Sequence, residues 1–562
     1  MQLPFPLVSF LGLLTSALES WTGGFSGTLG NDETFDYVVV GGGTAGVTLA
    51  VRLAEQKLRV ALVEAGETYE LRSPVAAIPG AASIGVGSDI QSSTAIDWKF
   101  VARNVTGANH RDIHYPRGKC LGGSSALNFM AYQRESMQLW ADLVQDQSYT
   151  FDNTLPYYQK TVQFTPLTRC DAPQMLQRNT ILMLSLMEDN AHFTGSLLGA
   201  QYCSFTIRPS DETRSSSQAA FLSPLPSSTY LKIYQGTMAK RILFNPQKQA
   251  SGVQVSDLLR TFTLNAEREV MISTGVFHTP QLLMVSGIGP ADTLSEHGID
   301  VVQDAPGVAL ETFTKVPTDL SYLTRQMAQY IFSHGGVLTN PVIDYLAFEK
   351  MPDSFRLNFS VQTIKDLSWF PDDWPEIEYI SSAAYVGNFS NPLISQPSGG
   401  KQYATILGTL VAPTSRGNVT IASNDTSDLP IINPNWLSSE ADQHVAIAAY
   451  KRIRDMFHSE AMAPIVVGDE YFPGSQYQTD AEILGVIRNT VMTIYHAACT
   501  CKMGTQDDPM AVLDSRARVF GVDRLRVVDA SAFPILGPGH PQSTVSDMLA
   551  EKIATDIISS LT

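Results

Sequence analysis

The chain has 562 residues, of which 44% are hydrophobic and 17% charged, and it carries a net charge of −17. This length accommodates roughly two or three domains with a large core, and the composition is that of a globular protein rather than a disordered one. The acidic balance and the lack of a basic run argue against nucleic acid as a partner, because phosphate binding requires clustered Lys and Arg.

Residues 1–20, MQLPFPLVSFLGLLTSALES, contain an apolar stretch of about fifteen residues that ends in small and polar residues, which is typical of a secretory signal peptide. The alternative is a disordered apolar tail, because no Lys or Arg precedes the stretch. The stretch is too short to span a bilayer, and no other segment reaches about eighteen uncharged apolar residues, so we expect no transmembrane helix. We therefore expect a secreted protein or one of the secretory pathway.

The stretch Phe35–Gly66 has the pattern of a strand, a glycine turn, a helix and a second strand. Asp36–Val40 is a buried-strand run that stops at three glycines, Val47–Gln56 has apolar residues at helical spacing, and Leu58–Glu64 is a second buried-strand run. A βαβ unit of about thirty residues in this order is typical of dinucleotide binding.

Three glycines of the turn, Gly41, Gly43 and Gly46, have the spacing G-x-G-x-x-G. The first permits a tight turn, the second lets a pyrophosphate approach the backbone, and the third lets the helix pack close to the strand. Thr44 and Ala45 begin the helix, whose N-terminal N–H groups favour a phosphate. A purely structural glycine turn is the alternative.

Glu64 and Ala65 follow the second strand, where a carboxylate accepts hydrogen bonds from the ribose hydroxyls of a bound dinucleotide. The acidic residue therefore stands where dinucleotide binding needs it. This motif alone does not choose between FAD and a nicotinamide nucleotide.

A glycine- and serine-rich stretch, Tyr115–Tyr132 (YPRGKCLGGSSALNFMAY), follows a predicted strand at Ile96–Ala102. Gly118, Gly122 and Gly123 form a donor-rich turn that passes into a helical pattern, and such a turn brings backbone close to a planar ring or a phosphate. Taken alone, such a stretch is more often only a turn.

In company with the βαβ unit, Tyr115–Tyr132 resembles the first signature of the glucose–methanol–choline (GMC) family of FAD-dependent oxidoreductases. Ser273–Gly289, STGVFHTPQLLMVSGIG, is similar to the second signature of that family. Ser415–Trp436 and Leu525–Ala554 resemble its C-terminal portion. The resemblance extends from about residue 35 to residue 558, with the motifs in the family's order.

The resemblance implies an α/β fold with a discontinuous FAD-binding Rossmann-like domain, expected at residues 35–165, 205–310 and 471–562. A second, α+β substrate domain on an antiparallel sheet is expected at 166–204 and 311–470. Leu127 occupies the position at which some members tether FAD through a histidine, so the resemblance implies noncovalent FAD. It places further FAD contacts at Gly118, Gly122, Gly123, Asn128, the backbone of Met238, Asp529, Ala530, Pro541 and Gln542.

Alcohol oxidation by a flavin requires a base that takes the hydroxyl proton while hydride moves to flavin N5, and histidine suits this role near neutral pH. By resemblance, His496 in TIYHAACTCKMG is the proton acceptor and His540 in FPILGPGHPQST is its partner. A helix predicted at Ser543–Ile553 would present its N-terminal amides to the flavin. The alternative for either histidine is a hydrogen-bonded residue of the core.

The expected function is oxidation of a small-molecule alcohol or hemiacetal, with oxygen or a quinone as electron acceptor. The sequence around the two histidines looks most like fungal members, several of which serve secondary metabolism on polyketide-like molecules. Alternatives are an aryl-alcohol or sugar oxidase of lignocellulose breakdown, a non-redox lyase or cyclase that keeps FAD, and an inactive flavin-binding protein. The last alternative rests on Pro306–Leu320, which lacks the family's usual Asn and His, and on the short passage between Thr165 and Gly199.

Acceptor sequences for N-glycosylation, Asn-x-Ser/Thr, occur at Asn104, Asn358, Asn388, Asn418 and Asn424. The 5 cysteines are too few for a disulfide framework. Cys170 and Cys203 either form one bridge or remain as two buried thiols. His496, Cys499 and Cys501 lack a second ligand pair at zinc spacing, so we expect no metal site.

Overall fold

The structure is a computed structural model. It describes residues 31–132, 137–162, 198–225, 230–299, 327–332, 337–341, 343, 345–382, 384–391, 395, 397, 403–464 and 466–561. The predicted signal peptide, Cys170 of the predicted disulfide, Pro306–Leu320 and nearly all of the passage from Thr165 to Gly199 lie outside these residues. No helix in the described ranges is long and apolar enough to cross a membrane.

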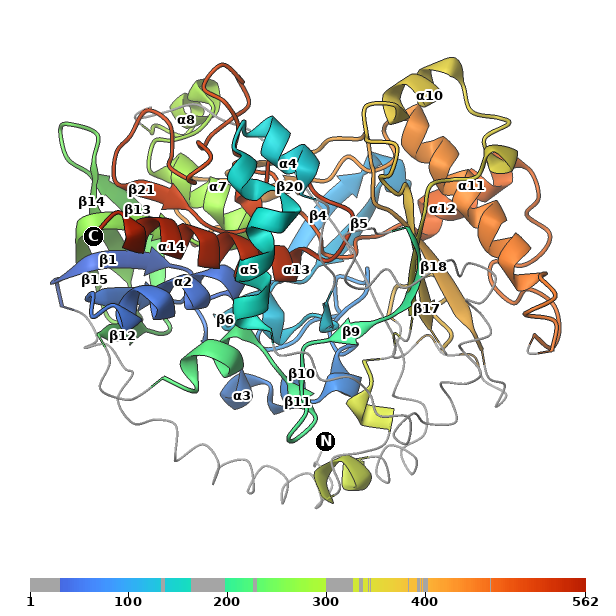
Figure 1. Cartoon of the computed structure of the whole chain (residues 1–562), viewed down its shortest axis with the longest axis horizontal. Helices are drawn as coiled ribbons and strands as arrows, with labels where there is room; N and C mark the ends of the chain where they lie inside the picture. Colours follow the sequence, from blue (N-terminus) through green and yellow to red (C-terminus); the bar gives the residue numbers. More distant parts are fainter. Residues whose placement is uncertain are drawn as a thin grey trace.

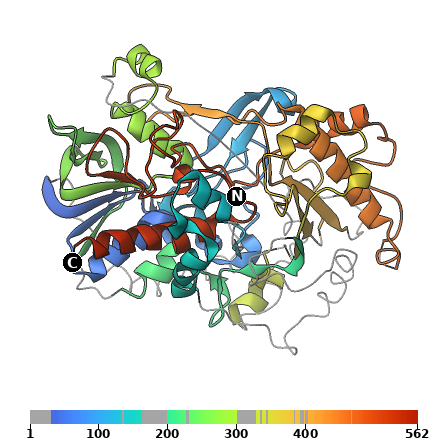
Figure 2. The same ribbon diagram turned by 45° about the horizontal axis from the view of Figure 1, so that its top comes forward.

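The chain folds into two lobes, each built on its own sheet (Figures 1 and 2). The first sheet has the strand order β12-β2-β1-β15-β14-β13, and β21 also pairs with β15. Pairing among β12, β2, β1, β15 and β21 is parallel, whereas β13 and β14 pair antiparallel. The strands are β1 (Glu33–Val40), β2 (Val60–Val63), β12 (Leu231–Tyr234), β13 (Met238–Phe244), β14 (Ala250–Ser256), β15 (Thr261–Ile272) and β21 (Leu525–Val527).

The central parts of the parallel strands are apolar because they are buried in the interior of the lobe. Every residue of β2 is buried, and Val38 and Val39 of β1 are 0% exposed. Helix α2 (Thr44–Glu55) connects β1 to β2, and the C-terminal helix α14 (Glu551–Ser559) packs against it. The predicted βαβ unit is present, and its helix begins at Thr44, directly after the glycine turn.

The second sheet is antiparallel, with the order β18-β17-β16-β8. Its strands are β8 (Gly199–Tyr202), β16 (Tyr345–Glu349), β17 (Ile377–Ser382) and β18 (Thr405–Leu410). Helices α10 (Val361–Leu367), α11 (Glu440–Phe457) and α12 (Asp480–Thr490) lie beside it in the right-hand lobe of Figure 1. All six residues of β17 are buried, so this strand runs through the middle of the lobe.

The remaining elements connect the lobes or cover the edges of the two sheets. They are β3 (Glu67–Thr68), α3 (Tyr69–Arg72), β4 (Phe100–Val105), β5 (Arg111–Tyr115), β6 (Cys120–Leu121), β7 (Ala131–Tyr132), α4 (Gln138–Leu143), α5 (Phe151–Thr161), β9 (Ser204–Phe205), β10 (Ile207–Arg208), β11 (Thr213–Arg214), α7 (Gly275–Val285), α8 (Ala291–Glu296), β19 (Asn418–Thr420), β20 (Ile431–Asn433) and α13 (Pro541–Ser543).

Three predicted elements differ from those in the structure. The strand predicted at Ile96–Ala102 begins only at Phe100, because Lys99 adopts a left-handed φ of 61° that interrupts the extended chain. The helical pattern within the first signature is a single 3₁₀ turn, Gly123–Ala126, and Met130 further along has a left-handed φ of 60°. The C-terminal helix begins at Pro541 and passes through a π-helical segment, Thr544–Ala550.

Candidate functional site

The glycine turn after β1 is built as the sequence predicts. Gly41 has φ of 101°, and a Cβ at this position would lie 2.3 Å from the carbonyl oxygen of Ser273. A Cβ on Gly46 would lie 1.9 Å from the carbonyl oxygen of Gly41, so only glycine lets α2 pack this close to the turn. A Cβ on Gly43 would meet nothing closer than 3.9 Å, so the side of the turn that faces a phosphate stays open.

Glu64 lies at the C-terminal end of β2 and is 6% exposed. Its Oε2 accepts a hydrogen bond from the backbone N–H of Gly42 at 2.9 Å, and its Oε1 accepts one from Gly66 at 2.7 Å. Burial raises the pKa of Glu64 to about 7, against the lowering effect of these two N–H donors. The two donors fix the carboxylate, and its remaining lone pairs can accept hydrogen bonds from a ligand.

The loop of the first signature approaches the glycine turn closely, since a Cβ on Gly123 would lie 2.7 Å from the Cα of Gly43. Arg214, which is 1% exposed, fixes this loop from behind. Its guanidinium donates to the carbonyl oxygens of Ser125 at 3.1 Å and Asn128 at 2.6 Å, and also to Oδ1 of Asn128 at 2.6 Å. Burial lowers the pKa of Arg214 to about 10. The sequence analysis missed Arg214, because no motif marks an arginine whose partners are mainly carbonyl groups.

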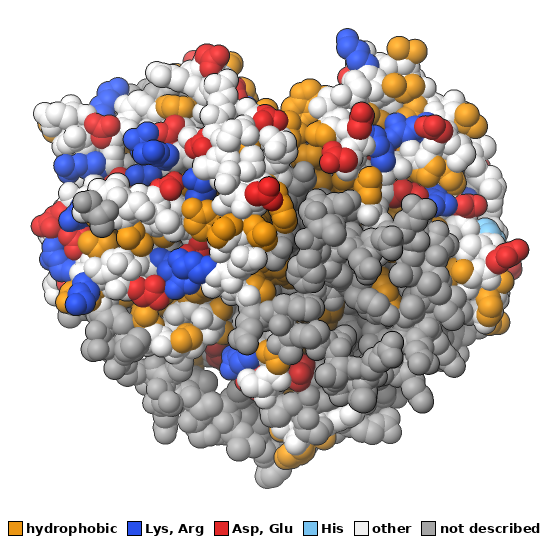
Figure 3. Space-filling model, in the orientation of Figure 1, with side chains coloured by type: hydrophobic (Ala, Val, Ile, Leu, Met, Phe, Trp, Pro, Cys, Tyr) orange, Lys and Arg blue, Asp and Glu red, His pale blue; other side chains and the backbone are white. Residues whose placement is uncertain are grey.

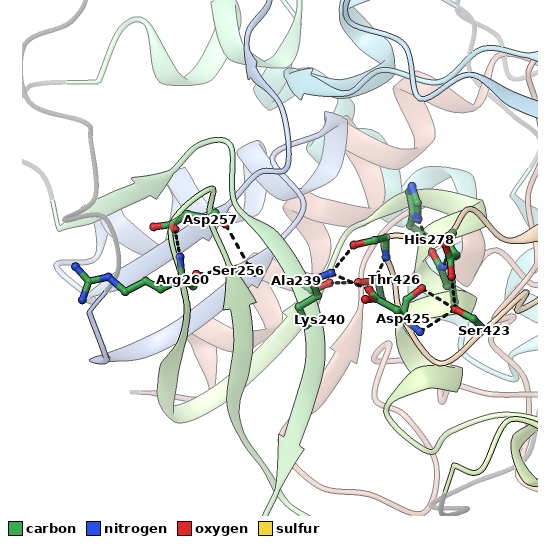
Figure 4. A network of polar contacts seen from close by, with 12 residues as sticks. Ala239, Lys240, Ser256, Asp257, Arg260, His278, Ser423, Asp425 and Thr426 are labelled. Carbon is green, nitrogen blue, oxygen red and sulfur yellow. Dashed lines mark hydrogen bonds and ion pairs between the residues drawn. The ribbon is translucent and has the colours of Figure 1, made fainter.

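The strand that follows Met238 is tied to a loop from the C-terminal half of the chain (Figure 4). Thr426 Oγ1 donates to the carbonyl oxygen of Ala239 at 2.7 Å, and Lys240 Nζ pairs with Oδ1 of Asp425 at 2.7 Å. His278, on α7, lies next to this loop in Figure 4, and burial lowers its pKa to about 4. The backbone of Met238 is thereby held at one end of the site.

One cavity of about 290 Å³ joins these features to the two predicted histidines. The predicted residues that line it are Gly41, Gly43, Thr44, Ala45, Glu64, Ala65, Gly118, Gly123, Asn128, Met238, His496, Asp529, Ala530, His540, Pro541 and Gln542. Gly46 and Gly122 do not line it: Gly46 packs α2 against the turn, and Gly122 shapes the loop with φ of 87°. Leu127 lines the cavity and offers no atom for a covalent link to a cofactor.

The side chain of Asp529 serves the protein rather than a ligand. Its Oδ2 accepts from the backbone N–H of Gly275 at 2.9 Å and from Thr279 Oγ1 at 2.6 Å, while its Oδ1 accepts from the N–H and the hydroxyl of Ser531 at 2.8 and 2.5 Å. These four bonds join the start of α7 to the segment after β21. A contact from Asp529 to a cofactor would therefore come from its backbone.

The two predicted catalytic histidines face each other across the cavity, with ring centroids 5.2 Å apart. His540 directly precedes α13, is 6% exposed, and its Nε2 is 2.9 Å from Oε1 of Glu378 on β17. Burial lowers the pKa of His496 well below its usual value, and the positive charges of His540 and Arg117 lower it further. His496 is therefore a neutral imidazole near pH 7, which is the form that accepts a proton.

Glu378 was missed by the sequence analysis. It is 0% exposed and lies on β17 of the second lobe, whereas His540 directly precedes α13. A single Glu within an apolar strand carries no motif, and only the packing of the two lobes brings it to His540.

A second and larger cavity, of about 1540 Å³, meets the first at His496 and Ile494. Tyr385, Tyr403 and Tyr471 line it, with ring centroids 5.0 to 5.6 Å apart. In Figure 3 a notch with hydrophobic side chains separates the two lobes at the top of the view. His496 thus lies between a cavity that reaches the glycine turn and one with aromatic walls, and His540 faces it from the first cavity.

Comparison with known proteins identifies the family. Models of the N-terminal and C-terminal parts of GMC oxidoreductases match residues 35–310 and 413–549. The chain belongs to the GMC oxidoreductase family. The expected family, the α/β fold with a Rossmann-like domain and the dependence on FAD are confirmed. The chain is an FAD-dependent oxidoreductase, and the glycine cradle, the buried Glu64 and the cavity between them fit that cofactor.

Three relatives illustrate the range of the family. Patulin synthase of Aspergillus clavatus is 43% identical over 98% of this chain and 96% of its own. Versicolorin B synthase of Aspergillus parasiticus is 36% identical over 97% of this chain and 90% of its own. The crystal structure of pyridoxine 4-oxidase from Mesorbium loti superposes with a TM-score of 0.75 at 25% identity, covering 93% of this chain and 99% of that one.

Proposed function

We propose that this GMC oxidoreductase oxidises an alcohol or hemiacetal hydroxyl of a secondary metabolite with a ring system. The observation that carries the proposal is the position of His496, which lines both the first cavity and the aromatic-lined cavity, with His540 facing it in the first. The similarity to patulin synthase supports secondary metabolism as the setting. The volume and aromatic walls of the second cavity favour a planar or multi-ring substrate over a small aliphatic alcohol.

The chain's own residues supply the acid–base part of the reaction. Neutral His496 takes the hydroxyl proton, and His540, oriented by Glu378, hydrogen-bonds the substrate oxygen. FAD, when bound, accepts the hydride from the carbon. Gly41, Gly43 and Glu64 would hold its adenosine and pyrophosphate.

The decisive experiment is spectroscopic. A metabolite comparison of cultures with and without the protein supplies the substrate, which is then mixed anaerobically with purified protein. An oxidase or dehydrogenase bleaches its visible flavin absorbance and forms a carbonyl product. His496→Ala should abolish bleaching while retaining FAD, and His444→Ala, a change on α11 outside the first cavity, should leave it intact. Lack of bleaching with every metabolite that accumulates without the protein would refute the proposal.

A non-redox reaction is the second candidate, supported by relatives that are named as synthases and by an imidazole pair that can serve proton transfer without hydride transfer. In this case substrate is consumed anaerobically while the flavin stays oxidised. The same experiment therefore separates the two functions.

The setting of the reaction is also part of the proposal. Oxygen or a quinone is the proposed electron acceptor, and reoxidation of the reduced enzyme by each, followed by stopped-flow absorbance, distinguishes them.

Entry into the secretory pathway is supported by the apolar N-terminus and by the exposure of the five acceptor asparagines, Asn104, Asn358, Asn388, Asn418 and Asn424. Recovery from the culture medium with a glycosidase-sensitive mass would agree with this location, and retention in the cytosol would refute it.

A further inference from the structure

The backbone directly before His496 is held in an unfavourable conformation. Tyr495 has φ of 68°, a left-handed value that bulky residues with a Cβ rarely adopt. Such a conformation persists only where surrounding contacts hold it. In this case the Tyr495 hydroxyl accepts a hydrogen bond from the Gly87 N–H at 3.4 Å, and the Tyr495 ring packs against Tyr115 at 6.2 Å between centroids. The direction of His496 depends on this strained residue.

Arg117, in the first signature loop, holds the carbonyl group of Tyr495. Its Nη2 donates a hydrogen bond to that oxygen at 2.7 Å, and its Nη1 donates one to the carbonyl oxygen of Pro116 at 3.3 Å. The guanidinium lies over the rings of Tyr115 and Phe277, at 4.8 and 5.4 Å from their centroids. Arg117 also lines the first cavity.

The charge of this guanidinium has no carboxylate partner within 4.0 Å among the residues that the structure describes. Buried charges are normally paired, because desolvation of an unpaired charge is costly. Burial accordingly lowers the pKa of Arg117. An unpaired cation kept beside His496 indicates a role that a neutral side chain of the same shape would not fill.

We propose that Arg117 is a positioning residue for His496: it locks the left-handed carbonyl of Tyr495 and places a positive charge beside the cavity that the imidazole lines. The inference rests on the proposed role of His496 as the base. It deepens that role, because it explains how the protein fixes both the direction and the protonation state of the imidazole.

The electrostatic part of the inference has a defined sign. Two groups that can carry positive charge act on His496, namely His540 across the cavity and Arg117 behind it. Glu378 is bonded to His540, and Asp97 lies near Arg117. Removal of the Arg117 charge leaves burial and His540 in place, so the pKa of His496 rises toward its usual value without passing it. The acid limb of the kcat/KM profile then moves to higher pH.

Arg117→Met removes both the hydrogen bond and the charge, Arg117→Gln keeps a donor without the charge, and Arg117→Lys keeps the charge. In Arg117→Met we expect the acid limb to move to higher pH and kcat to fall by about 10- to 100-fold, with little change in KM. In Arg117→Gln the acid limb should also move, while kcat falls less than in Arg117→Met. In Arg117→Lys the acid limb should stay at the wild-type position. Flavin absorbance and Tm report whether each variant folds and retains FAD.

The matched control is Arg111→Met. Arg111 is also partly buried and bonded to carbonyl groups, those of Ala108 at 3.1 Å and Arg488 at 3.4 Å, and burial also lowers its pKa. This control should lower Tm and leave the acid limb in place. An unmoved limb in both Arg117→Met and Arg117→Gln, or an equal movement in Arg111→Met, would overturn the inference.

If Arg117→Met does not fold, Arg117→Gln and Arg117→Lys decide the electrostatic part. If the wild-type protein proves to have no redox turnover, the proposed function fails but the inference remains testable. NMR titration of labelled histidines, with His496→Ala to assign the signal, measures the pKa of His496 without any substrate. A pKa that is the same in wild type and Arg117→Gln would refute the electrostatic role.

Discussion

Replacement of Glu378 gives the sharpest test of the catalytic geometry. The carboxylate bonds His540 at 2.9 Å, and the two side chains are 0% and 6% exposed, so no water substitutes easily for either partner. Its second oxygen, Oε2, has no hydrogen-bond partner among the described residues. A carboxylate that serves only stability would be expected to use both oxygens.

The size of the effect follows from the type of bond. A hydrogen bond to a charged acceptor contributes about 1.5–3 kcal/mol, and a neutral one about 0.5–1.5 kcal/mol. With each 1.4 kcal/mol worth roughly a factor of ten in rate, Glu378→Leu should slow flavin reduction by about 10- to 150-fold. Glu378→Gln keeps a neutral acceptor for His540 and should cost about 5- to 10-fold.

Anaerobic stopped-flow absorbance at saturating substrate measures flavin reduction directly. The matched control is Glu376→Gln, two residues away: Glu376 is 2% exposed, but it pairs with Arg356 at 2.6 Å instead of a histidine. This control should lower Tm and leave the reduction rate within about twofold. Reduction by Glu378→Leu at the wild-type rate, with FAD retained, would refute a positioning role for the carboxylate.

Four further predictions concern pH, cofactor binding and stability. Because burial and nearby cations lower the pKa of His496, kcat/KM should stay level as pH falls through 6.5 and should decline only below that value. A decline centred at or above pH 6.5 would contradict a neutral His496. Glu64→Ala should weaken FAD binding by about 10- to 100-fold through lost ribose hydrogen bonds, measured by fluorescence titration of apoprotein, and an unchanged Kd would exclude the predicted ribose contact. Since the pKa of Glu64 is raised to about 7 in the folded chain, the apoprotein should lose stability as pH rises from about 4.5 to 7, seen as a falling Tm. Arg214→Leu leaves the carbonyl groups of Ser125 and Asn128 without their donor, so it should lower the free energy of unfolding by about 3–5 kcal/mol and release FAD. Denaturant titration measures this loss, and a loss below about 1 kcal/mol would contradict the expected role of Arg214.

The sequence predicted the parts of the molecule that depend on local patterns. The buried strands of the βαβ unit and the spacing of Gly41, Gly43 and Gly46 reflect short-range backbone geometry, and the structure shows them with small shifts at the ends. The positions of His496 and His540 came from resemblance to a family rather than from any pattern of burial. The 5.2 Å between their ring centroids results from a fold that brings separate segments of the chain together.

What the sequence did not predict depends on contacts between distant segments. Glu378 lies in a strand of the second lobe, and Arg214 bonds mainly carbonyl groups, so neither has a local signature. Lys99 and Met130 adopt left-handed φ values that no propensity indicates; Lys99 delays the start of β4, and Met130 lies beyond the 3₁₀ turn where the chain is no longer helical. Arg117 lies within a recognised signature, but its link to Tyr495 is visible only in three dimensions.

The bond between His540 and Glu378 joins the two lobes at the reaction centre. A fragment that contained the nucleotide-binding lobe alone would keep both imidazoles yet lack the acid that aims one of them. Diversification of the strand that carries Glu378 is therefore constrained, because any neutral residue at position 378 slows the reaction.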